Sequence, residues 1–422
     1  MNPKSIEKHY QLAQELYAEK GVDTDKALNV LNSIQLSLPC WQTDDVTGLE
    51  YRDKHTNNGG IMTTGNYPGR ARNMNEIRMD LEKVLTLIPG RHRISLHAMY
   101  GDFQGQKVDR NEIEPAHFQS WIDWAKELRI GLDFNSTYFA HPKANSGFTL
   151  SSKDETIRSF WVEHGKRCRK IAARIGAAQG SPCIHNTWIP DGSKDLVIDK
   201  WGYRENLRKS LDEIFCKPYP KTDLRDSVES KLFGLGSETF VVGSYDFYLS
   251  YALKKQIMIC LDMGHFHPTE SVADKLSAIL QFSDNLLLHI TRSVRWDSDH
   301  VPILNQELLE LTKEIVRNRL LDRIFLALDF FDASINRISA FVIGIRATLI
   351  ALLAALLEPV DQLQESEKTG KTHITLSLVE DYKTMPLNAV WDYYCLIANV
   401  PPANQWIPEV EKYEEQVLSK RK

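Results

Sequence analysis

Eight short apolar runs punctuate the chain, and segments with a helical pattern separate most of them. The runs occupy residues 36–41, 93–100, 130–135, 182–189, 227–234, 257–264, 286–291 and 324–331. Apolar residues at spacings of three and four, typical of helices that bury one face, recur in the stretches between. These stretches are 74–88, 117–128, 156–175, 204–215, 272–282 and 305–320. Alternation of strands and helices over about 300 residues predicts an α/β fold, a (β/α)8 barrel of the TIM type.

Two regions fall outside this repeat. Residues 42–74 are rich in Gly, Asn and Thr, and a loop of this length is usually functional or disordered. We expect it to close over a bound ligand as a lid, with Tyr67 and Arg70 taking part. Residues 359–422 are expected to form a C-terminal helical extension used in subunit contacts, in which the polar stretch 365–373 is a linker before three short helices. The catalytic barrel domain would then comprise residues 1–358, including an N-terminal helix.

Composition and charge limit the kind of protein. The 422 residues are 42% hydrophobic and 25% charged, as in an ordinary globular protein. A net charge of −5 offers no basic surface for nucleic acid or anionic membranes. The six cysteines include no CxxC pair, and the amphipathic N-terminus lacks the apolar centre of a secretory signal, so we expect a cytoplasmic protein. The apolar stretch 338–357 is long enough for a membrane span, but Arg346 near its middle favours a buried helix.

Seven potential metal ligands lie at or just beyond the ends of the later apolar runs. In a parallel barrel the carboxyl ends of all strands open on one face, so these side chains can converge there. Asp262 and His265 can face one site only if the chain turns between them, which Gly264 permits. A single acid after a strand would more often cap a helix or pair with an arginine. Seven such residues predict a metal centre: Glu229, Asp262, His265, His289, Asp297, Asp299 and Asp329.

Electrostatics predicts two divalent cations at this centre. Five carboxylates gathered in one cavity would repel each other unless cations or protons compensate them. Two divalent ions together with Lys231 would balance the five negative charges and leave both histidines neutral. Carboxylate and imidazole ligands without a thiolate favour Mn²⁺, Mg²⁺ or Co²⁺, and two imidazoles favour manganese among these, while zinc in a mixed site stays open.

Several further residues are candidates for contact with a substrate. Trp188 follows a strand and precedes a turn, which places it at the open face of the barrel, and His97 ends another strand. Trp41, Phe134 and Trp296 are more often core residues than sugar-stacking platforms. Two other interpretations remain at this point: a metal-dependent phosphodiesterase or endonuclease barrel, for which the acidic chain lacks a basic groove, and a non-catalytic sugar-binding protein.

The chain also resembles the L-rhamnose isomerase family. The resemblance spans nearly the whole chain and rests on the strings WQTDDVTG, GNYPGRARN, NTWIPDG, VESKLFG, CLDMGHFHPTE, VRWDSDH and LDFFDASINR, in family order. It implies a (β/α)8-barrel isomerase that interconverts L-rhamnose and L-rhamnulose in rhamnose catabolism in the bacterial cytoplasm, commonly as a homotetramer. The segment 346–357 is more apolar than the corresponding charged helix of relatives, which puts the oligomer contacts in doubt.

Carried over residue by residue, the resemblance implies roles for the candidate site. The catalytic manganese would bind His265, Asp297 and Asp299, and the structural metal would bind Glu229, Asp262, His289 and Asp329. Lys231 would lie beside the O1 and O2 oxygens of the sugar. Trp188 and His97 would line the sugar pocket, and the loop near 59–72 would lie over its opening.

Overall fold

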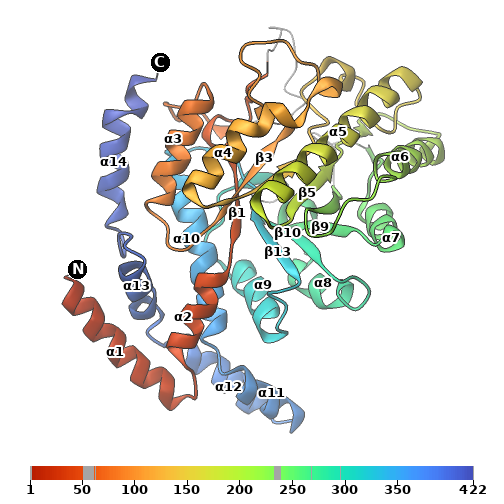
Figure 1. The fold of residues 1–422 in the computed structure, drawn as a ribbon. Coiled ribbons are helices and arrows are strands. Elements are labelled where there is room, and N and C mark those ends of the chain that lie inside the picture. Colours follow the sequence, from red (N-terminus) through yellow and green to blue (C-terminus); the bar gives the residue numbers. More distant parts are fainter. Residues whose placement is uncertain are drawn as a thin grey trace.

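A closed barrel of eight parallel strands forms the centre of the protein in a computed structural model (Figure 1). The structure describes residues 2–50, 61, 63–231, 239–267, 269–294 and 296–421. Each barrel strand pairs with the next along the chain, and the last pairs with the first. This confirms the predicted (β/α)8 architecture. The strands are β1 (Leu36–Pro39), β3 (Arg93–His97), β4 (Gly131–Asn135), β5 (Cys183–Trp188), β7 (Leu224–Glu229), β9 (Met258–Asp262), β10 (Leu286–Ile290) and β13 (Ile324–Leu328).

A helix follows each barrel strand and covers the outside of the barrel (Figure 1). Six of these helices lie where the apolar spacing predicts them, the eighth lies in the apolar stretch 338–357, and α7 is additional. The helices are α3 (Met74–Leu85), α4 (Gln119–Leu128), α5 (Glu155–Gln179), α6 (Lys200–Ile214), α7 (Tyr245–Lys255), α8 (Val272–Ile279), α9 (Gln306–Arg317) and α10 (Arg337–Leu356).

Alternation along the strands decides which side chains enter the barrel. In β10, Leu286, Leu288 and Ile290 belong to the main core beneath the helices, whereas Leu287 belongs to a second apolar cluster inside the barrel with Ile184, Met258, Cys260 and Ala327. Because side chains two apart on a strand share a face, His289 points into the barrel like Leu287. The burial pattern thus places an imidazole at the inner, carboxyl end of β10.

The apolar helix α10 is a core helix of this protein. It is the one helix among the described residues that is long and apolar enough to cross a membrane, and 78% of its most apolar window is buried inside the protein. It packs against α2 (Thr24–Ser33), α3, α9 and α13 (Leu387–Ile397). Its Arg346 is buried and donates hydrogen bonds to the backbone oxygens of Leu87, Pro401 and Ala403. The predicted buried helix is confirmed, and its charge is satisfied by carbonyl groups.

Replacing Arg346 with Met is expected to lower the free energy of unfolding by about 3–5 kcal/mol, because several buried carbonyl groups lose their donor at about 1–3 kcal/mol each. Chemical denaturation monitored by circular dichroism would measure the change. The matched control is Arg319→Met, whose side chain is 83% exposed and whose loss should cost no more than about 0.5 kcal/mol. Equal effects of the two substitutions would show that the carbonyl contacts of Arg346 contribute nothing.

In its described part, the C-terminal extension contains four α-helices and a final 3-10 turn at Leu418–Lys420; the helices are α11 (Val360–Lys368), α12 (Thr372–Tyr382), α13 and α14 (Trp406–Gln416). The predicted polar linker at 365–373 is wrong, since most of these residues belong to α11 and α12, which a short turn joins. The N-terminal helix α1 (Pro3–Glu19) lies against α13, where Tyr10 stacks on Tyr393 with ring centroids 3.8 Å apart. The division of the chain at residue 358 stays a prediction.

Candidate metal centre

The predicted ligands gather at the carboxyl ends of neighbouring barrel strands. Glu229 is the last residue of β7, Asp262 is the last residue of β9, and Asp329 follows the end of β13. His289 lies one residue before the end of β10, which pairs with both β9 and β13. Parallel pairing therefore brings four side chains from four strands to one point inside the barrel.

These four residues form a compact cluster. Glu229, Asp262, His289 and Asp329 each place a ligand atom within 4.8 Å of the others. The Nδ1 atom of His289 lies 3.1 Å from Asp329 Oδ2 and 3.6 Å from both Glu229 Oε1 and Asp262 Oδ2. Three carboxylates and one imidazole around one point are a donor set that suits a divalent cation such as Mn²⁺. The cluster is the same set of four residues that the sequence resemblance assigns to the structural metal.

Two buried polar atoms of the cluster are placed to bind a cation. Among the described residues, neither Asp262 Oδ2 nor His289 Nδ1 makes a hydrogen bond, although both are buried. The other carboxylate oxygen of Asp262 accepts a hydrogen bond of 2.6 Å from the Gly264 backbone N–H, which orients the side chain. Buried polar groups are rarely left unpaired, so a cation between these atoms would satisfy both.

The buried charges of the cluster also require compensation by protons or by a cation. Burial alone would lower the pKa of His289, but the neighbouring carboxylates of Glu229 and Asp329 raise it well above its ordinary value. Burial raises the pKa of Asp329 to about 6, against the opposing effect of His289. Burial also raises the pKa of the nearby Cys260 thiol well above its ordinary value, so a protonated thiol, not a thiolate, lies beside the cluster. Protons and a divalent cation are therefore alternative ways to balance these buried acids.

The structure describes only part of the second predicted ligand set, which consists of His265, Asp297 and Asp299. His265 closes a single 3-10 turn, Met263–His265, directly after β9, and its Nδ1 atom lies 3.0 Å from Glu229 Oε1. Asp299 lies in β12 (Trp296–His300), a short strand paired with β11 (Arg292–Val294), and lines the same cavity as His265. The side chain of Asp297 lies outside the described residues. Both described members of this set thus lie beside the four-residue cluster.

A small cavity above the cluster contains the remaining predicted residues. It is lined by His97, Trp188 and Lys231 together with Glu229, His265, Asp299 and Asp329. Glu229 and Lys231 both lie in the predicted strand 227–234, but β7 ends at Glu229 and Lys231 follows in the loop. The ammonium group of Lys231 lies 4.7 Å from the centre of the Trp188 ring. Both side chains nevertheless reach the cavity.

Aromatic rings form another part of the cavity wall. Trp41 stacks on His97 with ring centroids 3.9 Å apart and meets Phe331 edge-on. Burial, and then the nearby His289, lower the pKa of His97 to about 3, so its ring is neutral at physiological pH. Among the described residues, His97 Nδ1 and the indole N–H groups of Trp41 and Trp188 make no hydrogen bond. The cavity therefore combines apolar ring faces with polar groups available to a ligand.

Sequence reasoning missed several residues of this cavity. Asn186 donates a short hydrogen bond to Glu229 and accepts one of 2.9 Å from Ser227, which orients the carboxylate toward the cluster. Its position two residues before Trp188 on β5 could have revealed it, since both share one face of the strand. Trp41, expected in the core, is buried and also lines the cavity, whereas Phe134 is a core residue as expected. The other missed residues are Ile61, Asn135, Ser136 and Phe331.

The loop 42–74 lies partly outside the described residues, which exclude 51–60 and 62. Ile61 lines the cavity, but Tyr67 and Arg70 do not. The Tyr67 hydroxyl donates a hydrogen bond of 2.8 Å to Glu414 in α14, and Arg70 donates one of 3.5 Å to Thr47. Neither Tyr67 nor Arg70 is among the described residues that line the cavity, and their closure over a ligand stays a prediction.

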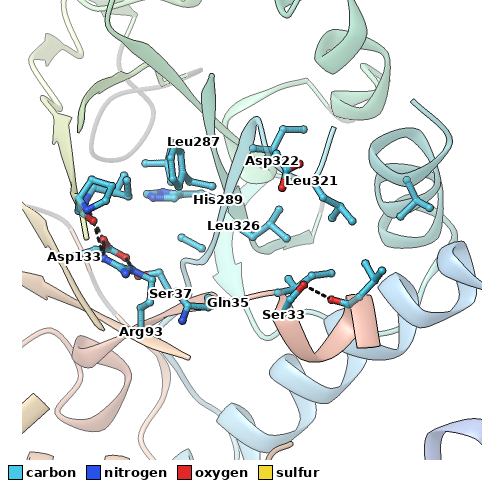
Figure 2. A pocket seen from close by; sticks show the side chains of 18 of the residues that line it. Ser33, Gln35, Ser37, Arg93, Asp133, Leu287, His289, Leu321, Asp322 and Leu326 are labelled. Carbon is cyan, nitrogen blue, oxygen red and sulfur yellow. Dashed lines mark hydrogen bonds and ion pairs between the residues drawn. The ribbon is translucent and has the colours of Figure 1, made fainter. Parts of the chain in front are cut away.

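A larger cavity of about 780 Å³ lies below the cluster, toward the amino ends of the strands. Figure 2 shows His289 at its inner end and the paired Arg93 and Asp133 on one side. The Arg93 guanidinium also donates to the carbonyl groups of Leu132 and Pro182. These hydrogen bonds and the ion pair with Asp133 compensate for the burial of its charge inside the barrel. This cavity offers no set of acids comparable to the cluster, so the candidate centre lies at the carboxyl end.

The closed parallel barrel and the acid and imidazole cluster at its carboxyl ends define a (β/α)8-barrel protein with a candidate metal centre. The profile of the family described as L-rhamnose isomerase (RhaA) matches residues 4–421. The chain belongs to the L-rhamnose isomerase family.

Relatives at high identity agree with the family profile. An L-rhamnose isomerase of Rhodopirellula baltica is 52% identical over 417 residues, which cover 99% of this chain and 97% of the relative. An L-rhamnose isomerase of Bacteroides thetaiotaomicron is 52% identical over 416 residues, 99% of each chain. Among solved structures, an L-ribulose 3-epimerase aligns at 11% identity with a TM-score of 0.49, over 76% of this chain and 95% of its own. Family membership makes the chain an enzyme and decides against both the endonuclease and the non-catalytic sugar-binding protein.

Proposed function

We propose that this enzyme interconverts L-rhamnose and L-rhamnulose by moving hydrogen between C1 and C2 at a site that holds two divalent cations. The observation that carries the proposal is the cluster of Glu229, Asp262, His289 and Asp329 at the carboxyl ends of the barrel strands in a chain of this family. A role in rhamnose catabolism follows from the same substrate. The cavity beside the cluster would hold the sugar.

The residues of the cluster fit a structural cation, and His265, Asp297 and Asp299 would hold a catalytic one. Bound there, the cations would polarise the adjacent sugar oxygens at C1 and C2 and acidify a neighbouring hydroxyl group. Mixed carboxylate and imidazole donors favour Mn²⁺, with Co²⁺, Mg²⁺ or Zn²⁺ as alternatives. We also propose a cytoplasmic homotetramer, which light scattering of the purified protein would test.

Three side chains of the cavity would act on the sugar directly. The Lys231 ammonium would stabilise negative charge that develops on the sugar oxygen at C1 or C2. Trp188 offers its ring face and an unpaired N–H, and the neutral His97 offers Nδ1 to a sugar hydroxyl. These contacts would fix the orientation of the sugar so that the hydrogen on C2 faces C1.

The reaction conserves atoms and electrons within the sugar. The C2–H bond breaks and a C1–H bond forms, while the proton of the C2 hydroxyl passes to the oxygen on C1. Among the described residues, the acids that line the cavity are Glu229, Asp299 and Asp329, all of which belong to the proposed ligand sets. Since that leaves no separate carboxylate base, we favour hydride transfer from C2 to C1 over an enediol.

An isomerase assay tests the proposal. Protein loaded with Mn²⁺ and incubated with L-rhamnose should form L-rhamnulose, and an EDTA-treated sample should form none. The same reaction in D2O separates the two routes, because hydride transfer brings no solvent deuterium onto the carbon atoms of the sugar whereas an enediol incorporates it at C1. Absence of ketose from fully loaded, folded protein would refute the proposed substrate.

A further inference from the structure

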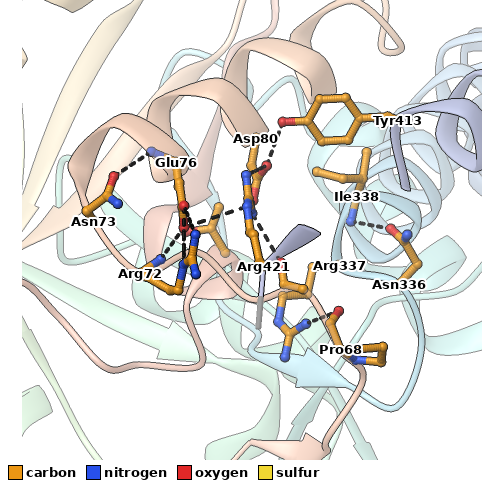
Figure 3. A network of polar contacts seen from close by, with 12 residues as sticks. Pro68, Arg72, Asn73, Glu76, Asp80, Asn336, Arg337, Ile338, Tyr413 and Arg421 are labelled. Atoms are coloured by element: carbon orange, nitrogen blue, oxygen red, sulfur yellow. Dashed lines mark hydrogen bonds and ion pairs between the residues drawn. The ribbon is translucent and has the colours of Figure 1, made fainter. Parts of the chain in front are cut away.

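A buried ion pair ties the C-terminal segment to the barrel. The guanidinium of Arg421, with its side chain 4% exposed, donates two hydrogen bonds of 2.7 and 2.8 Å to the carboxylate of Asp80 in α3. It also donates a hydrogen bond of 3.1 Å to the carbonyl oxygen of Gly69, and Figure 3 shows Arg421 between Asp80 and the loop at Pro68. Asp80 accepts another hydrogen bond of 2.7 Å from the Tyr413 hydroxyl, so the carboxylate is fully engaged. Arg421 therefore joins a helix of the barrel to the loop that contains Gly69.

Other contacts hold the same loop segment, residues 64–72, against α14 of the C-terminal extension and against the start of α10. The Tyr67 hydroxyl and the Asn336 amide both donate to Glu414 of α14, at 2.8 and 2.7 Å. Arg337 at the start of α10 donates to the carbonyl oxygen of Tyr67 at 2.7 Å and to that of Pro68 at 3.2 Å (Figure 3). The segment is thus held by α14 through Tyr67 and by the start of α10 through Arg337, and Asn336 joins these two helices to each other.

The packing at Gly69 leaves no room for adjustment. Gly69 has a φ of +84°, and a Cβ atom there would lie 2.7 Å from Cβ of the buried Leu418. Such a φ and such a close approach both require glycine. The loop segment is thus fitted against residues 418–421.

The other end of the segment reaches the candidate site. Thr64 and Gly65 form β2, which pairs with β14 (Asp332–Ala333), and the Tyr67 N–H donates to the Ala333 carbonyl at 2.8 Å. The Thr64 hydroxyl donates a hydrogen bond of 3.4 Å to the carbonyl of Ser298, the residue before Asp299. Ile61, just before the segment, lines the cavity. A displacement at Gly69 can therefore pass along a short, hydrogen-bonded stretch to the cavity wall.

We propose that Arg421 is a positioning residue for the isomerase reaction, acting through Asp80 and Gly69 to fix segment 64–72 and, through it, the cavity wall at Ile61 and Asp299. This inference rests on the proposed function, since it assigns the cavity to the sugar. Arg421 touches neither the cluster nor the residues that line the cavity. We therefore expect it to affect how well the sugar fits the cavity, and so the KM. The binding of the structural cation at the cluster does not depend on it.

The substitution Arg421→Met removes the charge and all of these donors. We expect it to raise KM for L-rhamnose by about tenfold with kcat within about threefold, because small displacements of positioning elements weaken the productive geometry. The Tyr67 amide should lose protection against hydrogen exchange, while Mn²⁺ content stays unchanged. Arg421→Lys, which keeps the charge, should restore part of the KM. Lys420→Met is the matched control, since Lys420 is exposed and should leave KM unchanged.

A double-mutant cycle with Thr64→Val tests the route. If Arg421 acts through the segment, Arg421→Met should raise KM much less in the Thr64→Val background than in the wild type. Independent, additive effects would overturn the inference, as would an unchanged KM in folded Arg421→Met. If Arg421→Met does not fold, Tyr413→Phe, which removes a single hydrogen bond to Asp80, replaces it in the cycle with the same criteria. Failure of the wild type itself to isomerise L-rhamnose would instead refute the proposed function.

Discussion

Replacing Asp299 with Asn is expected to lower kcat for L-rhamnose by at least about a thousandfold while the barrel stays folded. The substitution removes one negative charge and a strong oxygen donor from the proposed catalytic set, yet changes the shape of the side chain little. Asp299 has a φ of +45°, a conformation that asparagine also tolerates. Its backbone carbonyl can still accept the hydrogen bond of 3.2 Å from the Phe331 N–H. Ketose formation measures the activity, and circular dichroism with thermal unfolding checks the fold.

The control for this variant is Asp284→Asn. Asp284 is exposed and precedes β10 at the amino end of the barrel, opposite the candidate site. It should retain the activity of the wild type. A folded Asp299→Asn enzyme with near-normal kcat would show that Asp299 binds no catalytic cation.

Removal of divalent cations is expected to abolish activity and to destabilise the protein. The cluster confines three carboxylates within a few ångströms, and only protons balance them without a cation. A cation supplied at 100 to 1,000 times its dissociation constant would raise the free energy of unfolding by about 3–4 kcal/mol. Denaturation of EDTA-treated protein with and without Mn²⁺ measures the gain, and elemental analysis should find two ions per chain.

The variant Glu229→Gln provides the specific comparison. Glu229 is 2% exposed and faces both His265 and His289, so its loss should remove most of the stabilisation by Mn²⁺. Asp284→Asn should respond to Mn²⁺ like the wild type. Equal stabilisation of Glu229→Gln and the wild type would place the bound ion elsewhere in the protein.

The order of elements could be predicted because each depends on local patterning. Strands such as 286–290 are short and apolar, and helices such as α9 repeat apolar residues every three or four positions. Both patterns can be recognised in one sequence without an alignment. The ends of strands were less predictable. The predicted strand at 227–234 becomes β7, Leu224–Glu229, because polar Arg225 and Asp226 hid its start and the chain leaves the barrel after Glu229. Arg169, which pairs with Asp226 from α5, is what allows a charged residue there.

The mistaken linker at 365–373 has a similar cause. Its Glu, Lys and Thr residues resemble a solvent-exposed connection, yet they form the exposed faces of α11 and α12. Propensity and polarity are local, whereas these helices are held by contacts such as the hydrogen bond of 2.6 Å between Ser366 and Thr375. A polar helix face and a polar linker share one composition, so sequence alone could not separate them.

The sequence by itself determined the alternating strands and helices, the buried character of α10 and the ligand-type residues at the strand ends, because periodicity and side-chain chemistry are properties of neighbours along the chain. Only the tertiary structure decided that Glu229, Asp262, His289 and Asp329 meet within 4.8 Å, that Asn186 orients Glu229, and that Arg421 reaches Gly69 from the far end of the sequence. Those contacts join residues dozens to hundreds of positions apart. They arise when the barrel closes and the C-terminal helices pack against it, which no local pattern encodes.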